Sequence, residues 1–358
     1  MRNLFTIVGL GTALSLACGT ETSLKEGFAP TASMTVARNL HTATLLPDGM
    51  VLISGGQDLA SAELFDPGAA TFTPTATMAT RRSSHTATAL PGGMVLITGG
   101  YAAPNNLASA ELFNPGRGTF APTGTMATTR GLHTATLLHS GKVLIAGGWD
   151  VPQPLVANFL TTAELFDPGS GTFTATGTMI VPRMDFTATL LPNGTVLLAG
   201  GVNAGGYLAN AEIYNPATGT FTATDSMTMP RAYHTATLLH NGMVLIAGGG
   251  ADGYLARAEL YDPDTGRFAA TGGMTAPRGY HTATLLPNGQ VLIVGGYNGL
   301  WTLVGADLYD PRTGTFTATS DMTVPRQYHT ETLLADGKVL VAGGFDGVSI
   351  LSSTELYQ

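Results

Sequence analysis

The feature that most constrains this chain is a unit of about 44 to 53 residues that occurs seven times. Each copy carries a Gly-Gly pair after an apolar run, and most copies continue into Ala-Glu-Leu-(Phe/Tyr)-(Asp/Asn)-Pro or a near variant. The pairs are Gly55-Gly56, Gly99-Gly100, Gly147-Gly148, Gly200-Gly201, Gly248-Gly249, Gly295-Gly296 and Gly343-Gly344. A repeat of this length is typical of propeller blades or of another repeat array.

Spacing within the unit is constant except at one point. A His, or Phe186 in the fourth copy, stands 14 residues before the first Gly of each pair. Only the gap between the second Gly and the next acidic residue varies, from 7 to 16 residues. Insertions and deletions therefore fall in one loop per copy, which we call the variable loop.

Each copy has the pattern of four short strands. The first, residues 42–46 in the first copy, leads into a two-residue turn such as Asp48-Gly49, which tolerates the positive φ of a tight hairpin. The second is an unbroken apolar run, as at 291–294, typical of a strand buried on both faces. The Gly pair ends it, and Ala-Glu-Leu-Tyr and Thr-Phe-x-x-Thr form the third and fourth strands. The sequence predicts an all-β fold.

The unit resembles the kelch repeat, and residues 28–358 resemble the kelch β-propellers of the galactose-oxidase-like bacterial kind. The resemblance implies a seven-bladed propeller with four antiparallel strands per blade. The seventh copy ends at Gln358 without a fourth strand, whereas residues 28–34 align with residues 72–78, a fourth strand and its exit. We therefore expect an N-terminal strand to complete the C-terminal blade and close the ring, which removes exposed sheet edges.

Residues 1–27 precede the repeats. A short basic head and an apolar stretch up to Ala17 are typical of a signal peptide over 1–17, too short to span a bilayer. The single cysteine, Cys18, follows a stretch similar to a bacterial lipobox, which implies lipid attachment at Cys18, a flexible tether over 18–27 and an outer-membrane or cell-surface location. Ser15 departs from the lipobox pattern, so cleavage after Ala17 and secretion is the alternative. A cytosolic protein with a free cysteine is the third possibility.

Charge and residue content argue against several functions. Charged residues make up 11% of the chain and the net charge is −8, which argues against nucleic-acid binding. The oxidases of the family that this chain resembles hold copper through tyrosines and histidines and cross-link one tyrosine to a cysteine. The repeats of this chain contain no cysteine. The pairs Tyr233-His234, Tyr280-His281 and Tyr328-His329 are copies of one repeat position, so we interpret these histidines as structural. No unrepeated Asp or Glu stands out as a general acid or nucleophile. The sequence thus predicts no metal, no cofactor and no enzymatic activity.

Seven arginines mark the turn three residues before the His position: Arg38, Arg82, Arg130, Arg183, Arg231, Arg278 and Arg326. Because consecutive strands alternate in direction, we expect this turn on the same face of the ring as the variable loop. A circle of guanidinium groups could bind an anionic sugar or a carboxylate. The favoured alternative pairs each Arg with the acidic residue of its own third strand, from Glu63 to Glu355.

The variable loops carry the aromatic residues by which the copies differ. We predict ligand contacts at Tyr101, Trp149, Tyr207, Tyr254, Tyr297, Trp301 and Phe345, although each ring could instead cap its own blade. The long third loop, 149–162, is expected to project furthest. Aromatic rings on exposed loops suit a peptide or a sugar. The predicted function is a monomeric binding or scaffold protein of the bacterial cell envelope or exterior, with a protein partner on the loop face. A carbohydrate-binding propeller is the alternative, and a sugar-active oxidase is less favoured.

Overall fold

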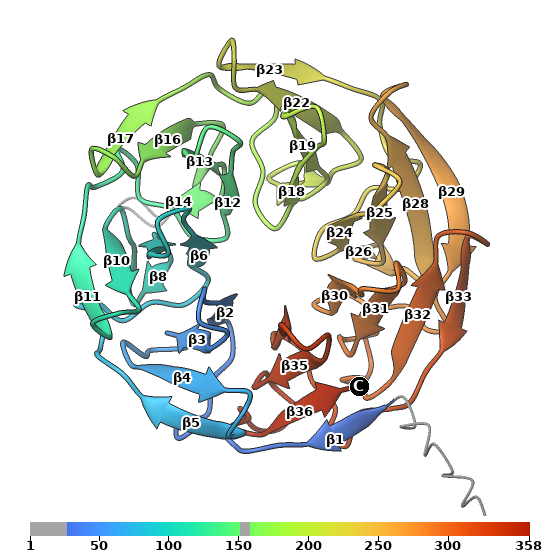
Figure 1. Ribbon diagram of the computed structural model, residues 1–358. Coiled ribbons are helices and arrows are strands. Elements are labelled where there is room, and N and C mark those ends of the chain that lie inside the picture. Colours follow the sequence, from blue (N-terminus) through green and yellow to red (C-terminus); the bar gives the residue numbers. More distant parts are fainter. Residues whose placement is uncertain (1–26, 151–157) are drawn as a thin grey trace, which may run out of the picture.

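The computed structural model describes residues 27–150 and 158–358, which form a ring of seven four-stranded antiparallel sheets around a central axis (Figure 1). No helix occurs in these ranges. The predicted all-β fold, a seven-bladed propeller with four antiparallel strands per blade, is confirmed. The signal peptide, Cys18 and nearly all of the predicted tether lie outside the described residues, and within the described ones no helix is long and apolar enough to cross a membrane.

Each blade has its innermost strand at the axis and its fourth strand at the rim. Blade one consists of β2 (Thr42–Leu45), β3 (Val51–Ser54), β4 (Ala62–Asp66) and β5 (Thr71–Pro74). Blade two consists of β6 (Thr86–Ala89), β7 (Val95–Thr98), β10 (Ala110–Asn114) and β11 (Thr119–Pro122). Blade three consists of β12 (Thr134–Leu137), β13 (Val143–Ala146), β16 (Ala163–Asp167) and β17 (Thr172–Ala175). Blades four and five consist of β18 (Thr187–Leu190), β19 (Val196–Ala199), β22 (Ala211–Asn215) and β23 (Thr220–Ala223); β24 (Thr235–Leu238), β25 (Val244–Ala247), β28 (Arg257–Asp262) and β29 (Arg267–Gly273). Blades six and seven consist of β30 (Thr282–Leu285), β31 (Val291–Val294), β32 (Ala306–Asp310) and β33 (Thr315–Ala318); β34 (Thr330–Leu333), β35 (Val339–Ala342), β36 (Thr354–Tyr357) and β1 (Phe28–Pro30).

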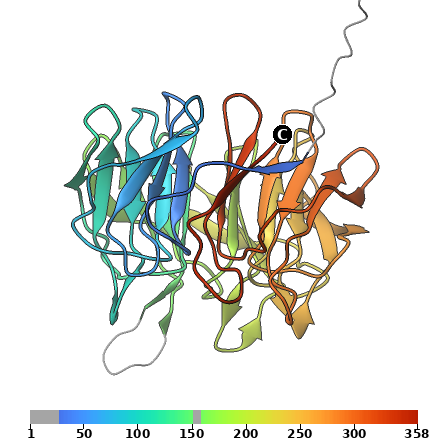
Figure 2. The ribbon, with the colours of Figure 1, turned by 90° about the horizontal axis from the view of Figure 1, so that it is seen from below.

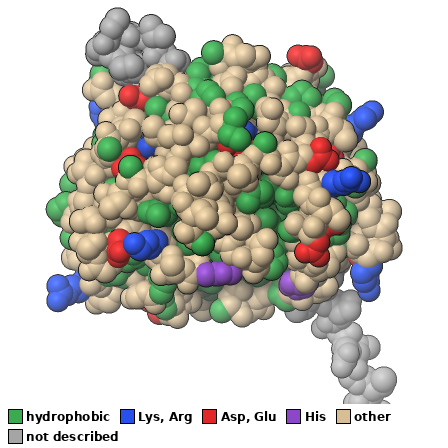
Figure 3. All heavy atoms as spheres, turned by 90° about the horizontal axis from the view of Figure 1, so that it is seen from above, with side chains coloured by type: hydrophobic (Ala, Val, Ile, Leu, Met, Phe, Trp, Pro, Cys, Tyr) green, Lys and Arg blue, Asp and Glu red, His purple; other side chains and the backbone are tan. Residues whose placement is uncertain are grey.

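The apolar second strands form the core between blades. In the cluster between blades four and five, Leu197 and Ala199 of β19 pack with Val244 and Ile246 of β25, and all four are buried. Seven such clusters occur around the ring. Each blade therefore buries its two faces against its neighbours, as expected for a repeat array. Charged side chains are scattered over the side of the ring drawn in Figure 3, and some acidic and basic ones lie next to each other.

The two ends of the ring differ. The hairpin turns such as Asp48-Gly49 lie at one end, which we call the turn face. The variable loops and the arginine turns lie at the other, the loop face, where antiparallel bridges join them, as between Ser83 and Tyr101. The variable loops and the arginine turns therefore lie on the same face of the ring, as predicted. Four variable loops form small hairpins: β8 (Tyr101–Ala102) with β9 (Asn105–Asn106), β14 (Trp149–Asp150) with β15 (Asn158–Phe159), β20 (Val202–Asn203) with β21 (Gly206–Tyr207), and β26 (Gly250–Ala251) with β27 (Gly253–Tyr254).

The ring closes by joining the two ends of the chain, as predicted. Strand β1 pairs with β36, with Phe28 opposite Tyr357, and their ring centroids lie 4.9 Å apart. Gly27 and Gln358 exchange backbone hydrogen bonds of 3.2 and 3.1 Å. Both described chain ends therefore lie at the turn face, which is at the top of Figure 2.

Replacing Phe28 with Ala tests this closure. The variant loses the contact with Tyr357 on a strand held by one neighbour in its own blade, and we expect a destabilisation of about 3 kcal/mol. Phe72→Ala is the matched control, because Phe72 packs on Phe65 at 4.8 Å in a blade whose four strands are consecutive in the chain. Amide hydrogen exchange should accelerate in β36 for Phe28→Ala and not for Phe72→Ala. Equal exchange of β36 in both variants would contradict a special role for the closure.

Candidate functional site

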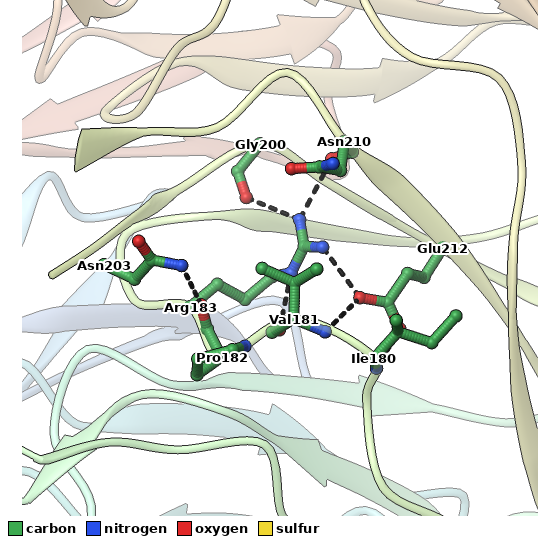
Figure 4. Close-up of polar contacts among 8 residues, drawn as sticks. All are labelled: Ile180, Val181, Pro182, Arg183, Gly200, Asn203, Asn210 and Glu212. Carbon is green, nitrogen blue, oxygen red and sulfur yellow. Dashed lines mark hydrogen bonds and ion pairs between the residues drawn. The ribbon is translucent and has the colours of Figure 1, made fainter. Parts of the chain in front are cut away.

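The seven arginines are buried ion-pair partners. In blade four, shown in Figure 4, Arg183 Nη2 donates to Glu212 Oε1 at 2.8 Å, and Nη1 donates to the carbonyls of Gly200 and Asn210 at 2.7 and 3.0 Å. Glu212 also accepts from the backbone amides of Ile180 and Val181 at 2.7 and 3.0 Å. Each unit thus ties the arginine turn to the Gly pair and the third strand.

The same pair recurs in every blade at N···O distances of 2.7–3.0 Å: Arg38–Glu63, Arg82–Glu111, Arg130–Glu164, Arg183–Glu212, Arg231–Glu259, Arg278–Asp307 and Arg326–Glu355. All seven arginine side chains are at most 1% exposed. A guanidinium group in this setting is not available to a ligand. The structural interpretation of the arginines is the one that the structure supports.

Blade six departs from this pattern because its acid is one methylene shorter. Asp307 pairs with Arg278 at 2.8 Å, but its Oδ1 is buried without a hydrogen-bond partner among the described residues. In other blades the second carboxylate oxygen accepts the amide just after the repeat methionine, as Glu355 does from Thr323 at 2.8 Å.

We expect Asp307→Glu to stabilise the protein by about 1 kcal/mol, because the longer side chain brings its second oxygen to the amide of Thr275. The denaturation midpoint measures this gain. The reverse change in blade seven, Glu355→Asp, is the control and should lower the midpoint by a similar amount. An unchanged midpoint for both would show that the second oxygen contributes nothing.

The repeated histidines link neighbouring blades. Each places its Nε2 2.9–3.1 Å from the Oγ1 of a threonine in the preceding blade: His41 with Thr330, His85 with Thr42, His133 with Thr86, His234 with Thr187, His281 with Thr235 and His329 with Thr282. Burial, followed by the nearby arginine charge, lowers the pKa of His41, His133 and His234 to about 3. Where Phe186 replaces His, the hydroxyl of Thr134 is buried without a partner. These contacts agree with the structural interpretation of the histidines.

The Gly pairs are required by the turn that carries the arginine and the histidine. A Cβ on Gly248, whose φ is 64°, would lie 2.5 Å from the carbonyl oxygen of Arg278 and 2.8 Å from the ring of His281. We expect Gly248→Ala to cost about 3 kcal/mol or more, since backbone must move.

Gly49→Ala is the control for Gly248→Ala: its φ is also positive, at 85°, but a Cβ there meets nothing within 4 Å. It should cost about 1 kcal/mol from backbone strain alone. Thermal and chemical denaturation of the two variants separate these costs, and equal costs would refute the close approach.

Seven residues form a closed ring around the axis at the loop face. They are the residues that precede the His position: Leu40, Ser84, Leu132, Asp185, Tyr233, Tyr280 and Tyr328. All have φ between 51 and 58°, and the amide of each donates to the carbonyl of the residue before it around the ring at 3.1–3.4 Å. We call this the axial ring. Left-handed backbone is uncommon outside glycine, so seven such residues are held there by the surrounding blades.

Six tyrosines gather on the loop face over blades four to seven. We call Tyr207, Tyr233, Tyr254, Tyr280, Tyr297 and Tyr328 the tyrosine cluster. Ring centroids lie 4.3 Å apart for Tyr233–Tyr280 and 4.5 Å apart for Tyr280–Tyr328. Tyr207 approaches Tyr233 at 6.5 Å, and Tyr254 approaches Tyr280 and Tyr297 at 6.3 and 5.4 Å. Burial raises the pKa of Tyr233 to about 12 and raises those of Tyr254, Tyr280 and Tyr328 as well. These four phenols therefore stay protonated at neutral pH.

Three of the predicted ligand residues, Tyr207, Tyr254 and Tyr297, belong to the tyrosine cluster. The others lie elsewhere on the loop face. Tyr101 and Trp149 stand in β8 and β14, and Phe345 is bridged to Gln327. Trp301 is 72% exposed at the tip of the blade-six loop. The central part of the long third loop, 151–157, lies outside the described residues. The structure thus brings the axial tyrosines into contact with Tyr207 and Tyr254 and separates the two tryptophans.

Sequence reasoning missed two unrepeated carboxyl groups. Asp185 stands in the axial ring, and Glu331 lies in β34 where the six other copies have Ala. Burial raises the pKa of Asp185 to about 7 and that of Glu331 to about 8. Both carboxyl oxygens of Glu331 are buried without a hydrogen-bond partner that meets ordinary geometry. The sequence carried a signal for Glu331, because Thr-Glu-Thr-Leu at 330–333 interrupts the run of Thr-Ala-Thr-Leu.

Comparison with known proteins shows the fold. No protein-family model and no curated protein matches the sequence. A solved structure described as a novel fungal alcohol oxidase with catalytic diversity among the AA5 family, in complex with copper, matches 93% of this chain and 76% of its own, with a TM-score of 0.78 and 18% identity. The structure of YjhT matches 81% of this chain and 99% of its own, with a TM-score of 0.63 and 15% identity. The chain is similar to both in its propeller.

The prediction of no enzymatic activity needs correction. It rested on the missing cysteine and on the absence of a distinctive acid, but one of these solved proteins with the same ring is an oxidase. The missing cysteine argues only against the cross-linked copper site, and the unrepeated carboxyl groups of Asp185 and Glu331 were overlooked. An identity of 18% shows a shared fold, so the oxidase's activity does not transfer to this chain. Among the described residues, no group of three or more His, Cys, Asp or Glu is arranged to hold a metal ion.

Proposed function

We propose that this protein binds a protein partner through the loop face, with the loops of blades six and seven as its anchor. Four large apolar side chains stand out there: Leu300, Trp301, Val348 and Ile350. The first three are 75, 72 and 87% exposed. Exposed apolar groups gathered on neighbouring loops favour a protein interface, and tryptophan is enriched among the residues that dominate binding energy. This exposure is the observation that carries the proposal.

The two loops are built alike and lie side by side. In each, an Asn or Asp side chain holds the tip by accepting two backbone amides: Asn298 from Leu300 and Trp301 at 2.9 and 2.8 Å, and Asp346 from Val348 and Ser349 at 2.7 and 2.6 Å. A Cβ on Gly347 would lie 3.3 Å from Thr302 Oγ1 of the adjacent loop. Tips held in this way lose little conformational entropy on binding, which favours affinity.

The chain ends lie at the face opposite the proposed interface. Gly27, where the described chain begins, lies at the turn face beside Gln358. A lipid anchor at Cys18 would therefore hold the protein by the turn face and leave the loop face directed away from the membrane. This orientation would also let a secreted form present the same surface.

Capture experiments test the proposal. The full chain, immobilised and exposed to envelope extract of its host, should retain a partner that Trp301→Ala combined with Val348→Ser no longer retains. Ile180→Ser is the matched control, because Ile180 is an exposed apolar residue on the blade-four arginine turn. If the double variant and Ile180→Ser capture the same proteins as the parent, the apolar tips are not the anchor.

A carbohydrate ligand is the second candidate, favoured by the tyrosine cluster. Aromatic rings stack on sugar faces and their hydroxyls bind sugar hydroxyls. Glycan-array binding that disappears in Tyr207→Ala, while the apolar-tip double variant keeps it, would support this alternative over the protein partner.

A further inference from the structure

We propose that Asp185 and the tyrosine cluster form a receptor for a guanidinium group, an arginine side chain that the partner inserts at the axis of the loop face. This inference rests on the proposed function, since the arginine belongs to the protein partner. It assigns a chemical identity to the centre of the face, whereas the apolar tips lie further out on the loops of blades six and seven.

Asp185 holds a distinct position in the axial ring. It is the only residue of the axial ring with an acidic side chain, with Leu132 on one side and Tyr233 on the other. Its amide donates to Leu132 and its carbonyl accepts from Tyr233, so the backbone position is held by the ring. The side chain therefore stands at the point where the small half of the ring, Leu40 to Leu132, meets the aromatic half.

The carboxylate of Asp185 is not neutralised within the part of the chain that the structure describes. No described residue donates a hydrogen bond to it or forms an ion pair with it, and burial alone raises its pKa to about 7. Arg183, two residues earlier, already pairs with Glu212 and donates to the carbonyls of Val181, Gly200 and Asn210. Asp185 is half-buried, and a partly desolvated acid without a partner is costly, so a cation that reaches it gains both the ion pair and relief of that cost.

The tyrosines supply the second half of the receptor. Burial raises the pKa of both Tyr233 and Tyr328, and the charge of Asp185 raises both further, so both phenols lie within electrostatic reach of this carboxylate. Tyr233, Tyr280 and Tyr328 form a continuous run of tilted rings beside it. Neutral aromatic rings next to a carboxylate attract a cation through the ring quadrupole as well as through the charge.

A guanidinium group fits this setting better than an ammonium group. It is planar, it can stack on a ring while its donor fork faces a carboxylate, and it is more weakly hydrated, so entering a half-buried site costs it less. Arginine is also enriched among the residues that dominate protein interfaces. The predicted partner thus presents an exposed arginine near an apolar patch.

The test uses N-acetyl-arginine amide as the probe and the tyrosine signals of the full protein, labelled on its tyrosine rings, as the NMR readout. Saturable shifts are expected for the parent, with at least a tenfold weaker affinity in Asp185→Asn. Asp252→Asn, which removes an exposed carboxylate from the blade-five loop, should bind like the parent. The neutral citrulline amide should not bind, and binding should tighten from pH 6 to pH 8 as Asp185 ionises. Tyr233 and Tyr328, the titratable groups whose pKa the Asp185 charge raises, stay protonated over this range.

Three results would overturn the inference. They are absence of saturable shifts with the arginine amide, equal binding by Asp185→Asn, and a lysine amide that binds as tightly as the arginine amide. Capture of the partner should also weaken in Asp185→Asn. If capture depends on Trp301 and Val348 but not on Asp185, the inference fails while the proposed function stands. If the probe binds through Asp185 but no capture depends on the apolar tips, the proposed function fails while the guanidinium site stands.

Discussion

Replacing Glu212 with Ala is expected to destabilise the propeller by about 3–5 kcal/mol, the usual cost of removing one partner from a buried ion pair. The variant leaves the Arg183 charge buried without its counter-ion, and it leaves the amides of Ile180 and Val181 without an acceptor. Burial already lowers the pKa of Arg183, and Glu212 is the group that opposes this effect. Chemical denaturation, analysed with the same denaturant m value for variant and parent, measures the loss of unfolding free energy.

The exposed pair Arg312–Asp310 provides the control. Its N···O distance, 2.9 Å, is similar, but Arg312 is 87% exposed, so Arg312→Ala should change the stability by less than about 1 kcal/mol. The loss of stability in Glu212→Gln should lie between those of Glu212→Ala and Arg312→Ala, because the amide oxygen keeps an acceptor in place without the charge. If Glu212→Ala and Arg312→Ala destabilise equally, burial does not govern the strength of these pairs.

Replacing Glu331 with Ala is expected to stabilise the protein, by about 2–4 kcal/mol above pH 8. This glutamate is the one non-alanine at its repeat position, and its carboxyl oxygens are buried beside Thr282 and Thr284 of the neighbouring blade. Burial raises its pKa from 4.5 to about 8. At about 1.4 kcal/mol per pKa unit, this shift corresponds to at most about 5 kcal/mol of penalty for the ionised form.

The sign of the pH dependence follows from the raised pKa. The folded state holds the Glu331 proton up to about pH 8, whereas the unfolded chain releases it near pH 4.5, so this group's contribution is fully present below pH 4.5 and is lost as the pH rises through 8. Asp185, with a pKa of about 7, acts in the same direction. The buried histidines act in the opposite direction, since their lowered pKa makes stability fall as the pH falls below about 6.5.

Comparing parent and variant at each pH cancels the contributions of Asp185 and the histidines. The difference in unfolding free energy between Glu331→Ala and the parent should grow from pH 5 to pH 9. Glu331→Gln should abolish the same pH-dependent difference while keeping a buried polar group, so it should stabilise less than Ala does. A difference that stays constant over this range would show that Glu331 titrates normally in the folded protein.

The repeat predicted the architecture because each strand and turn of a blade follows from the residues of one copy. Apolar runs such as 291–294 became the buried second strands, and the missing fourth strand of the last copy correctly predicted that residues near 28 would pair with Tyr357. The pairing of each Arg with its Glu was likewise readable, because constant spacing in every copy points to a contact within the blade. Structural features that recur in all seven copies can therefore be predicted from the sequence.

The candidate site depended on departures from the repeat and on their positions around the ring. Departures from the repeat such as Asp185 and Glu331 can be read in the sequence. Their burial and lack of partners, however, depend on neighbouring blades about 50 residues away in sequence. The tyrosines of three successive copies stack only because ring closure brings the same repeat position of every blade to one axis.

The sequence alone therefore determined the blade, the number of blades and the way the ring closes, since these follow from local strand patterns, tight turns and the order of strands. Only the tertiary structure decided that the arginines and histidines are enclosed, that six tyrosines meet over one half of the loop face, and that Leu300, Trp301 and Val348 stay exposed. The physical reason is that burial and electrostatic environment depend on the summed packing of neighbouring blades, which no single repeat contains.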